Sequence, residues 1–190
     1  MPELPEVETT LRGVAPHLVG RRIIGVDVRE RRLRWPVPKE IDDLGGKTPL
    51  SASRRAKYLL FEFAHGTVIL HLGMSGSLRI VDPDCGWRKH DHLALRLETG
   101  RELRFHDPRR FGCVLFCQGD PEGHSLLKHL GPEPLEDNFD VGYLASAAAG
   151  KSVAIKQLIM NSQVVVGVGN IYACESLFLS GIHPTRPAGR

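Results

Sequence analysis

Apolar residues recur at helical spacing near the start of the chain. Val7, Leu11, Val14 and Leu18 follow one another at intervals of three or four positions, which places them on one face of a helix. Acidic residues at the start of this segment complement the positive end of a helix dipole. Pro16 predicts that the helix ends or kinks just before it, because proline lacks the N–H that a helix interior uses.

Between residues 23 and 117 the pattern changes to alternating apolar positions rich in β-branched residues, which is typical of strands. The links His65-Gly66 and Thr99-Gly100 are predicted as hairpin turns, because glycine tolerates the positive φ that such turns need. Short strands without long helices between them indicate an antiparallel sandwich or barrel. The predicted strands are Ile23–Val28, Tyr58–Phe63, Thr67–Leu72, Ser77–Val81, His92–Glu98, Glu102–His106 and Cys113–Cys117.

Helical spacing returns in the last third of the chain. The segment Gly131-Pro132-Glu133-Pro134 predicts a linker, and helices are predicted over 153–161 and 171–180. The predicted class is therefore α+β: an N-terminal antiparallel β-sandwich domain with flanking helices over residues 1–131, followed by a helical domain over residues 132–190. The second part is small for an independent domain, so we expect it to be incomplete.

Composition and charge narrow the class of protein. The chain has 190 residues, 42% of them hydrophobic and 25% charged, with a formal net charge of +3, which excludes a disordered, collagenous or coiled-coil protein. No apolar run is long enough to span a membrane, and no leader precedes the first helix, so a cytoplasmic protein without membrane contact is expected. The four cysteines lack metal or disulfide spacing and are predicted to be reduced thiols.

Basic residues concentrate in one segment. Residues 21–57 hold eleven basic and five acidic residues, and most of the basic ones are arginines. Such an excess attracts a polyanion, although a solvated charged face has the same composition. Charge by itself leaves both interpretations open.

The N-terminus offers nucleophilic chemistry. If Met1 is removed, Pro2 carries a free secondary amine, whose pKa of about 7.7–8.0 lies far below that of lysine. The adjacent helix start disfavours the cation further, so the neutral amine can attack an aldehyde-level carbon. Glu3 is placed to transfer the proton. Lys57 is a candidate second amine or phosphate contact. The alternatives are an ordinary chain start and a solvated lysine.

Two predicted turns expose unusual side chains. Met74 lies between glycines in Gly73-Met74-Ser75-Gly76, and Arg109 and Phe111 lie in the turn 107–112. A methionine, an arginine and an aromatic ring on neighbouring loops fit a wedge that enters a DNA duplex and unstacks it. Alternatively, Met74 and Phe111 cap the core of the sandwich.

Histidines and a glycine-rich turn suggest further sites. His90 and His92 share a strand face, but no third metal ligand has matching spacing, so contact with phosphate or an ordinary surface role competes with a metal site. Gly167-Val168-Gly169-Asn170 precedes a helix, where backbone N–H groups can approach an anion and Asn170 can act as cap or donor. Lys151 and Lys156 on the preceding segment would strengthen phosphate binding there.

Six ordered motifs together resemble the bacterial formamidopyrimidine-DNA glycosylase family, and the resemblance runs along nearly the whole chain. They are MPELPEVET (1–9), RRAKYLL (54–60), HLGMSG (71–76), KHDH (89–92), DPRRFG (107–112) and VGVGNIYA (166–173). The resemblance implies a β-sandwich domain followed by a helix-two-turn-helix domain, with duplex DNA in the cleft between them. It also implies base-excision repair: excision of oxidised purines such as 8-oxoguanine and formamidopyrimidines, then cleavage of the abasic strand by AP lyase activity.

The resemblance also implies residue roles. Pro2 would attack C1′ and form a Schiff base, Glu3 would donate a proton to the opening sugar, and Lys57 would support the chemistry while contacting phosphate. The side chains expected to fill the gap left by the everted nucleotide are Met74, Arg109 and Phe111. Those expected to hold the DNA are His71, His90, Arg109, Lys151, Lys156 and Asn170.

The sequence departs from the family in one respect. Full-length members bind one structural zinc through a C-terminal zinc finger, and that segment is absent here, so no cofactor is expected in this chain. Because the zinc finger contributes phosphate contacts, we expect weak lesion binding and impaired activity. A monomeric enzyme acting on damaged double-stranded DNA is the first hypothesis. A non-catalytic damaged-DNA-binding fragment is the second, and a metal-dependent hydrolase using the histidines is the third.

Overall fold

The computed structural model describes residues 2–190 and divides the chain into two compact units, Met1–His124 and Ser125–Arg190. The division falls a few residues before the boundary expected from the sequence. The segment predicted as a linker lies in the second unit, where the Gly131 N–H donates to the Ser162 carbonyl at 2.8 Å and the Pro132 carbonyl accepts from the Val166 N–H at 3.1 Å. The two units are described separately below.

Helix α1 (Leu4–Leu18) opens the first unit and buries the apolar face predicted for it. Of the two alternatives predicted at Pro16, an end or a kink, the end is wrong, because α1 continues through Pro16 to Leu18. Pro16 lies in the last turn and costs one hydrogen bond, about 0.5–1.5 kcal/mol, whereas burying Leu18 completely contributes about 1.5–3 kcal/mol. The turn still closes through the Val19 N–H, which donates to the Ala15 carbonyl at 2.9 Å.

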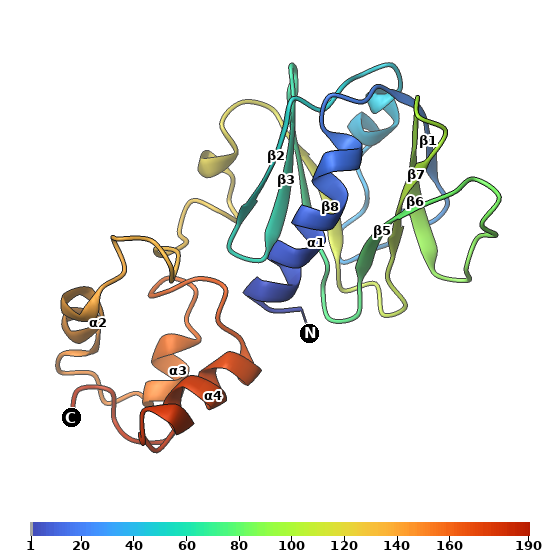
Figure 1. Ribbon diagram of the computed structural model, residues 1–190. Helices are drawn as coiled ribbons and strands as arrows, with labels where there is room; N and C mark the ends of the chain where they lie inside the picture. Colours follow the sequence, from blue (N-terminus) through green and yellow to red (C-terminus); the bar gives the residue numbers. More distant parts are fainter. Residues whose placement is uncertain (1) are drawn as a thin grey trace. The chain divides into compact units, whose positions relative to one another are not determined.

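Eight strands form two four-stranded antiparallel sheets, so the sandwich prediction is confirmed (Figure 1). All seven predicted strands are present, each within one residue of its predicted ends. One sheet has the order β1-β6-β7-β5, with β1 (Ile23–Val28), β6 (Asp91–Leu97), β7 (Glu102–His106) and β5 (Ser77–Val81). The other has the order β2-β3-β4-β8, with β2 (Ser51–Arg55), β3 (Tyr58–Phe63), β4 (Gly66–His71) and β8 (Cys113–Cys117).

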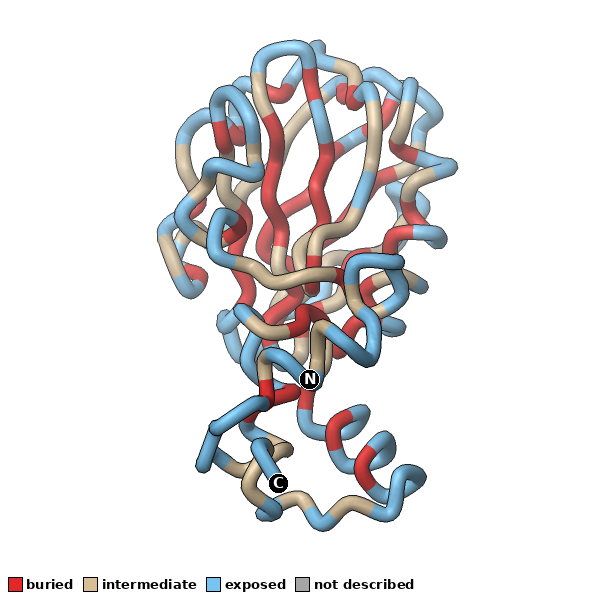
Figure 2. The backbone as a smooth tube through the Cα atoms, turned by 90° about the vertical axis from the view of Figure 1, so that its left-hand side faces the viewer, coloured by how far each residue is buried: buried red, intermediate tan, exposed pale blue. Residues whose placement is uncertain are grey.

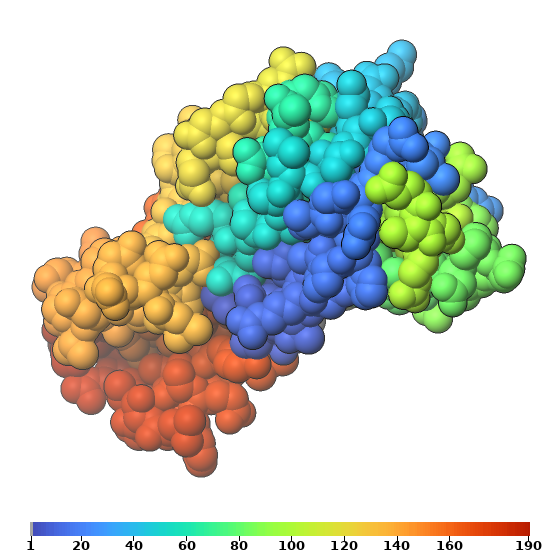
Figure 3. Space-filling model, turned by 45° about the horizontal axis from the view of Figure 1, so that its top comes forward, coloured from blue at the N-terminus to red at the C-terminus, as the bar shows by residue number. Residues whose placement is uncertain are grey.

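Apolar side chains on the facing sides of the two sheets make the main core. Leu59, Phe61, Leu97 and Phe105 are almost completely buried in it. Figure 2 shows the buried positions as red stretches along the strands. Helix α1 contacts β2, β3 and β5, so its apolar face covers the side where the two sheets are open (Figure 1). The outer side of α1 is uncovered on the face drawn in Figure 3.

The two predicted hairpin turns are present, one of them displaced by a residue. Phe63 pairs with Gly66, so Ala64 and His65 form the tip between β3 and β4, while Gly66 already belongs to β4. Thr99-Gly100 lies in the turn between β6 and β7, and Gly100 has the positive φ of 83° that the turn needs. The 3-10 helices η1 (Lys39–Leu44) and η2 (Pro121–Gly123) complete the first unit.

The second unit contains α2 (Val141–Ala148), α3 (Ile155–Ile159) and α4 (Asn170–Leu179), packed around a small cluster of Ile159, Ala173 and Leu177. Helix α2 was not predicted, because its sequence lacks the polar face that marks an amphipathic helix. Its start is fixed by Asp140, whose carboxylate accepts from the Tyr143 N–H at 2.7 Å. Across residues 2–190, no helix has both the length and the apolar character needed to cross a membrane.

Candidate functional site

The N-terminal candidates meet at the start of α1. Pro2 is half-buried, and Glu3, which follows it, is 2% exposed and stands at the N-cap position of α1. The Glu3 N–H donates to Glu6 Oε2 at 2.8 Å, which fixes the backbone immediately after Pro2. The helix dipole therefore points its positive end toward Pro2. The expected removal of Met1 concerns a residue outside the described part of the chain.

Lys57 approaches this helix start from another part of the chain. It lies in the two-residue turn between β2 and β3, after Ala56, whose φ is 53°. Burial lowers the pKa of the Lys57 ammonium, and the negative charges of Glu3 and Glu6 act in the opposite direction. The fold thus brings the Lys57 ammonium near the buried carboxyl group that follows Pro2, and Lys57 is half-buried there.

His71 ends β4 on the same side of the sheet as Tyr58, whose ring lies 4.9 Å from the imidazole. Its Nδ1 accepts from the Gly73 N–H at 2.9 Å. Burial first, and then the positive charges of Arg34 and Lys57, lower the pKa of His71 to about 4. The imidazole is therefore neutral at pH 7 and carries its proton on Nε2, where it can donate to an anion.

The depressed pKa of His71 predicts a pH-dependent stability. The unfolded chain binds a proton at His71 below a pH of about 6.5, whereas the folded chain does so only near 4. The free energy of unfolding therefore rises with pH between these values and is flat above them. Urea unfolding at about pH 5 and about pH 7.5 should show this loss of stability at the lower pH in the wild type and a smaller loss in His71→Gln. Equal losses in both proteins would contradict the assignment.

Met74 and Phe111 lie on two exposed loops that touch each other. Met74 is 41% exposed and Phe111 is 45% exposed, so the alternative that they cap the sandwich core is wrong. The Arg109 guanidinium lies 4.8 Å from the centre of the Phe111 ring. Met74 and Phe111 line a cavity of about 290 Å³ together with Arg34, His71 and Gly73. The two loops pack closely against each other. A Cβ added at Gly73 would lie only 2.4 Å from the Gly112 nitrogen, so the contact leaves room for glycine alone.

His90 lies on the other side of the turn 107–112. It lines a cavity of about 330 Å³ whose other charged residues are basic (Arg29, Lys89 and Arg110) and acidic (Glu30 and Asp91). The basic residues outnumber the acidic ones by one, so the charge of this lining favours an anion only slightly. The structure thus places His71 and His90 on cavities that both border the turn containing Arg109.

The neighbouring histidines serve the fold. The His90 ring lies 6.2 Å from that of His92 and 6.0 Å from that of His106. His92 Nε2 lies 2.7 Å from the Asp107 carbonyl oxygen, and His106 Nδ1 lies 2.9 Å from Asp91 Oδ1, so both rings have hydrogen-bond partners. Within residues 2–190 no three His, Cys, Asp or Glu side chains are arranged to hold a metal ion.

The candidates in the second unit form a polar pair and a separate lysine. Lys156 Nζ donates to Asn170 Oδ1 at 2.8 Å, which leaves the Asn170 amide nitrogen available as a donor. Asn170 is the first residue of α4, and its expected role as the cap is wrong, because Gly169 holds the N-cap position. Lys151 is exposed beyond the end of α2.

Several arginines of the basic segment 21–57 are engaged in ion pairs. Arg31 pairs with Asp42, Arg32 pairs with Glu30 at 2.8 Å, and Arg54 pairs with Glu8 at 2.9 Å. Attraction of a polyanion by this segment stays a prediction. Sequence reasoning gave no individual site role to Arg34, which shares a cavity with His71, or to Glu6, which acts on Lys57. Their only signal was their proximity in sequence to basic and acidic runs.

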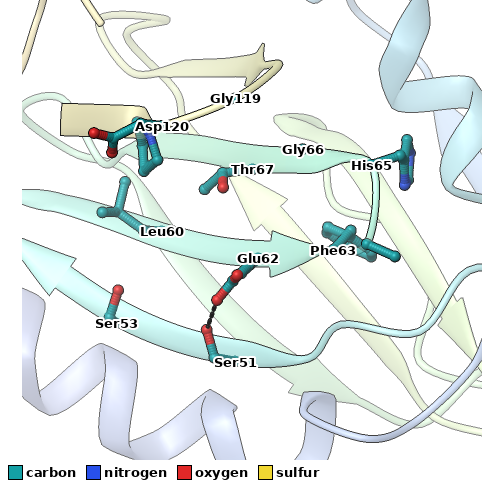
Figure 4. Close-up of a pocket in the computed structure, with 12 residues that line it drawn as sticks. Ser51, Ser53, Leu60, Glu62, Phe63, His65, Gly66, Thr67, Gly119 and Asp120 are labelled. Carbon is teal, nitrogen blue, oxygen red and sulfur yellow. Dashed lines mark hydrogen bonds between the residues drawn. The ribbon is translucent and has the colours of Figure 1, made fainter. Parts of the chain in front are cut away.

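A further cavity of about 580 Å³ lies on the outer face of β2, β3 and β4 and contains none of the predicted site residues. Its lining is polar around Leu60, and Ser51 donates to Glu62 Oε2 at 2.8 Å across its edge (Figure 4). The predicted site residues of the first unit lie elsewhere. Pro2, Glu3 and Lys57 lie at the start of α1, and Met74, Arg109 and Phe111 lie on the two contacting loops.

Comparison with known families accounts for both units. The formamidopyrimidine-DNA glycosylase N-terminal domain matches residues 1–114, and the formamidopyrimidine-DNA glycosylase H2TH domain matches residues 130–190. The chain belongs to the formamidopyrimidine-DNA glycosylase family. The first match contains Pro2, Glu3 and the other candidates of the sandwich, and the second contains Lys151, Lys156 and Asn170.

Individual relatives agree with this family assignment. The formamidopyrimidine-DNA glycosylase of Alcanivorax borkumensis is 60% identical over 190 residues, and that of Thioalkalivibrio sulfidiphilus is 61% identical over 191 residues. Each alignment covers 100% of this chain and 70% of the relative. A solved complex between the Lactococcus lactis enzyme and DNA containing an abasic site is 34% identical, with a TM-score of 0.91, and covers 99% of this chain and 70% of that one.

A second solved Lactococcus lactis structure contains the inhibited enzyme with N7-benzyl-Fapy-dG DNA, again with 34% identity and a TM-score of 0.91. It covers 99% of this chain and 71% of that one. These likenesses agree with the observed sandwich and the helix-two-turn-helix unit.

The residues present do not fit the zinc site of full-length family members. Cys113 and Cys117 are buried in β8, whereas Cys85 and Cys174 are exposed on separate elements. Burial raises the pKa of the Cys113 thiol to about 11, which keeps it protonated and unsuited to metal binding.

Proposed function

We propose that this base-excision-repair DNA glycosylase removes oxidised purines from duplex DNA and then cleaves the abasic strand, using Pro2 as its nucleophile. Family membership supports the glycosylase activity. The observation that carries the lyase step is the buried Glu3 carboxyl group beside Lys57, immediately after Pro2. The expectations of a monomer and of a cytoplasmic location stay predictions from the sequence.

The first step joins the enzyme to the sugar. The Pro2 nitrogen forms a bond to C1′ as the bond between C1′ and the damaged base breaks. The Glu3 carboxylate takes the proton that the amine loses, and the departing base takes a proton from water. Glu3 gives a proton to the ring oxygen, so the sugar opens and C1′ becomes part of an iminium ion. Lys57 lies next to Glu3 and contributes positive charge where a DNA phosphate would lie.

The second step cleaves the strand. The iminium ion makes the C2′ hydrogens acidic, so a base removes one of them and the C3′–O bond breaks with the phosphate as leaving group. Free enzyme is regenerated when water adds to C1′ and releases Pro2. A hydrolytic attack on phosphorus is not needed.

The exposed loops supply what the chemistry requires of the DNA. A base inside the helical stack keeps C1′ out of reach of an amine, so the nucleotide must leave the stack and something must replace it. Met74, Arg109 and Phe111 are exposed on touching loops and suit that replacement. We assign phosphate contacts to His71, His90, Lys151, Lys156 and Asn170. In support, His71 and Asn170 each have a donor available, and Arg29, Lys89 and Arg110 line the cavity of His90.

Borohydride trapping tests the proposal. The chain is incubated with duplexes containing 8-oxoguanine, an abasic site or neither, and sodium borohydride is added to reduce any iminium ion to a stable adduct. We expect a covalent complex with the first two duplexes and none with the intact one, together with strand cleavage when borohydride is omitted. Binding of damaged duplex without an adduct would favour the non-catalytic DNA-binding fragment. Cleavage abolished by EDTA would overturn the proposed mechanism.

A further inference from the structure

Asp107 is a completely buried acidic residue to which the proposed chemistry gives no role. It follows β7 and is the first residue of the turn that carries Arg109 and Phe111. Its backbone is held on both sides, since its N–H donates to the His90 carbonyl at 3.0 Å and its carbonyl oxygen lies 2.7 Å from His92 Nε2. The residue is therefore fixed to the sandwich.

The Asp107 side chain connects the loop 73–76, which carries Met74, with the turn 107–112, which carries Arg109 and Phe111. These three exposed side chains are called the wedge below. Within its own turn, Oδ2 accepts from the Gly112 N–H at 2.8 Å and Oδ1 accepts from the Arg109 N–H at 3.3 Å. Across to the other loop, Oδ1 accepts from the Ser75 hydroxyl at 3.1 Å. Ser75 is the neighbour of Met74, so one carboxyl group holds backbone or side-chain groups next to all three wedge residues.

These hydrogen bonds require both carboxylate oxygens of Asp107 to act as acceptors. The N–H groups of Gly112 and Arg109 only donate, and they approach different oxygens of Asp107. Alanine offers no acceptor and would leave these groups without a partner in the interior. Asparagine keeps the shape and one oxygen, so it would retain the Gly112 bond while opposing the Arg109 N–H with its own N–H.

The surrounding backbone shows why such an anchor is needed. Arg110, in the same turn, has a φ of 55°, which is unfavourable for a residue with a side chain. The two loops also approach closely, because a Cβ added at Gly73 would lie 2.4 Å from the Gly112 nitrogen and 2.6 Å from the Phe111 carbonyl carbon. A strained turn in such close contact keeps its form only where other interactions hold it.

We propose that Asp107 is a positioning residue that fixes the Met74 loop and the Arg109–Phe111 turn to each other before DNA binds. The two loops then enter the duplex as one preformed wedge, and no ordering of loops is required when the base is displaced. Asp107 itself touches no DNA. The inference rests on the proposed function only in its consequence for catalysis, since the anchoring of the loops is measurable without activity.

Three variants test the anchor. Asp107→Ala removes all the carboxyl contacts, Asp107→Asn keeps part of them, and Ser75→Ala removes only the bond between the loops. Asp84→Asn, at an exposed position in the connection between β5 and β6, is the matched control. Hydrogen exchange should be about tenfold faster at the Gly112 amide in Asp107→Ala than in the wild type, and unchanged in the control. An unchanged Gly112 rate would overturn the anchor whatever the activity is.

The catalytic consequence is read from two substrates. Borohydride trapping on a single-stranded abasic oligonucleotide needs no wedge, whereas excision of 8-oxoguanine from a duplex does. We expect duplex excision to fall by about a hundredfold in Asp107→Ala and about fivefold in Ser75→Ala, with Asp107→Asn between them, while single-strand trapping stays within about twofold. Equal losses on both substrates would overturn the positioning role.

If Asp107→Ala fails to fold, the result for Ser75→Ala decides between the two outcomes. Absence of trapping by the wild type would refute the proposed function and leave the exchange result standing.

Discussion

Blocking the Pro2 amine is expected to reduce the borohydride-trapped adduct with abasic DNA by at least about a thousandfold. The simplest block is Pro2→Leu, because a large second residue prevents removal of Met1. The terminal amine then lies one residue farther from Glu3 and Lys57, and position 2 becomes an amide nitrogen that cannot attack. The rate of adduct formation with a single-stranded abasic oligonucleotide measures the effect, after intact mass confirms that Met1 is retained.

Pro5→Ala is the matched control for this experiment. Pro5 is an exposed proline in the first turn of α1, and its replacement leaves the terminal amine in place. We expect trapping by this variant to stay within about twofold of the wild type, since alanine is well tolerated in a helix. Undiminished trapping by a chain that carries Met1 would show that another amine, with Lys57 as the first candidate, forms the adduct.

The sequence predicts the sandwich well because its strands carry the required pattern themselves. β3 and β4 are short apolar runs bounded by turn residues, and β7 alternates polar and apolar residues, so each can be recognised by itself. β2 was missed, since Ser51-Ala52-Ser53-Arg54-Arg55 has no apolar alternation. That strand is stabilised by its pairing with β3, from Ser51 opposite Glu62 to Arg55 opposite Tyr58, and such a partner is invisible in a local window.

The site was predictable as a set of residues but not as a geometry. Pro2 and Glu3 are adjacent in sequence, so their shared chemistry follows from position. Lys57 joins them only because the turn between β2 and β3 reaches the start of α1, and no local pattern reveals that approach. The same limitation hid the role of Asp107. Its hydrogen bond to Ser75 spans 32 positions along the chain. The motif at residues 107–112 therefore predicted a turn but not the loop to which that turn is hydrogen-bonded.

Replacing Glu3 by glutamine is expected to slow single-turnover excision of 8-oxoguanine by about a hundredfold to ten-thousandfold. The amide keeps the size of the side chain and its place at the N-cap of α1, but it cannot donate a proton to the sugar oxygen. A second effect adds to the first. The negative charge of Glu3 raises the pKa of Lys57, although burial lowers that pKa by more. Replacing Glu3 by glutamine removes this charge, so the pKa of Lys57 falls further. A smaller fraction of Lys57 is then positively charged and able to bind phosphate.

Glu6→Gln separates these two effects. Glu6 also raises the pKa of Lys57, and its oxygen accepts from the Glu3 N–H at 2.8 Å, a bond that glutamine can keep. The variant therefore removes a comparable charge near Lys57 while Glu3 remains as the proton donor. We expect it to slow excision by less than about tenfold, because proton transfer is intact. If the two glutamine variants lose activity equally, the carboxylates act through the charge around Lys57, and the assignment of Glu3 as the proton donor is wrong.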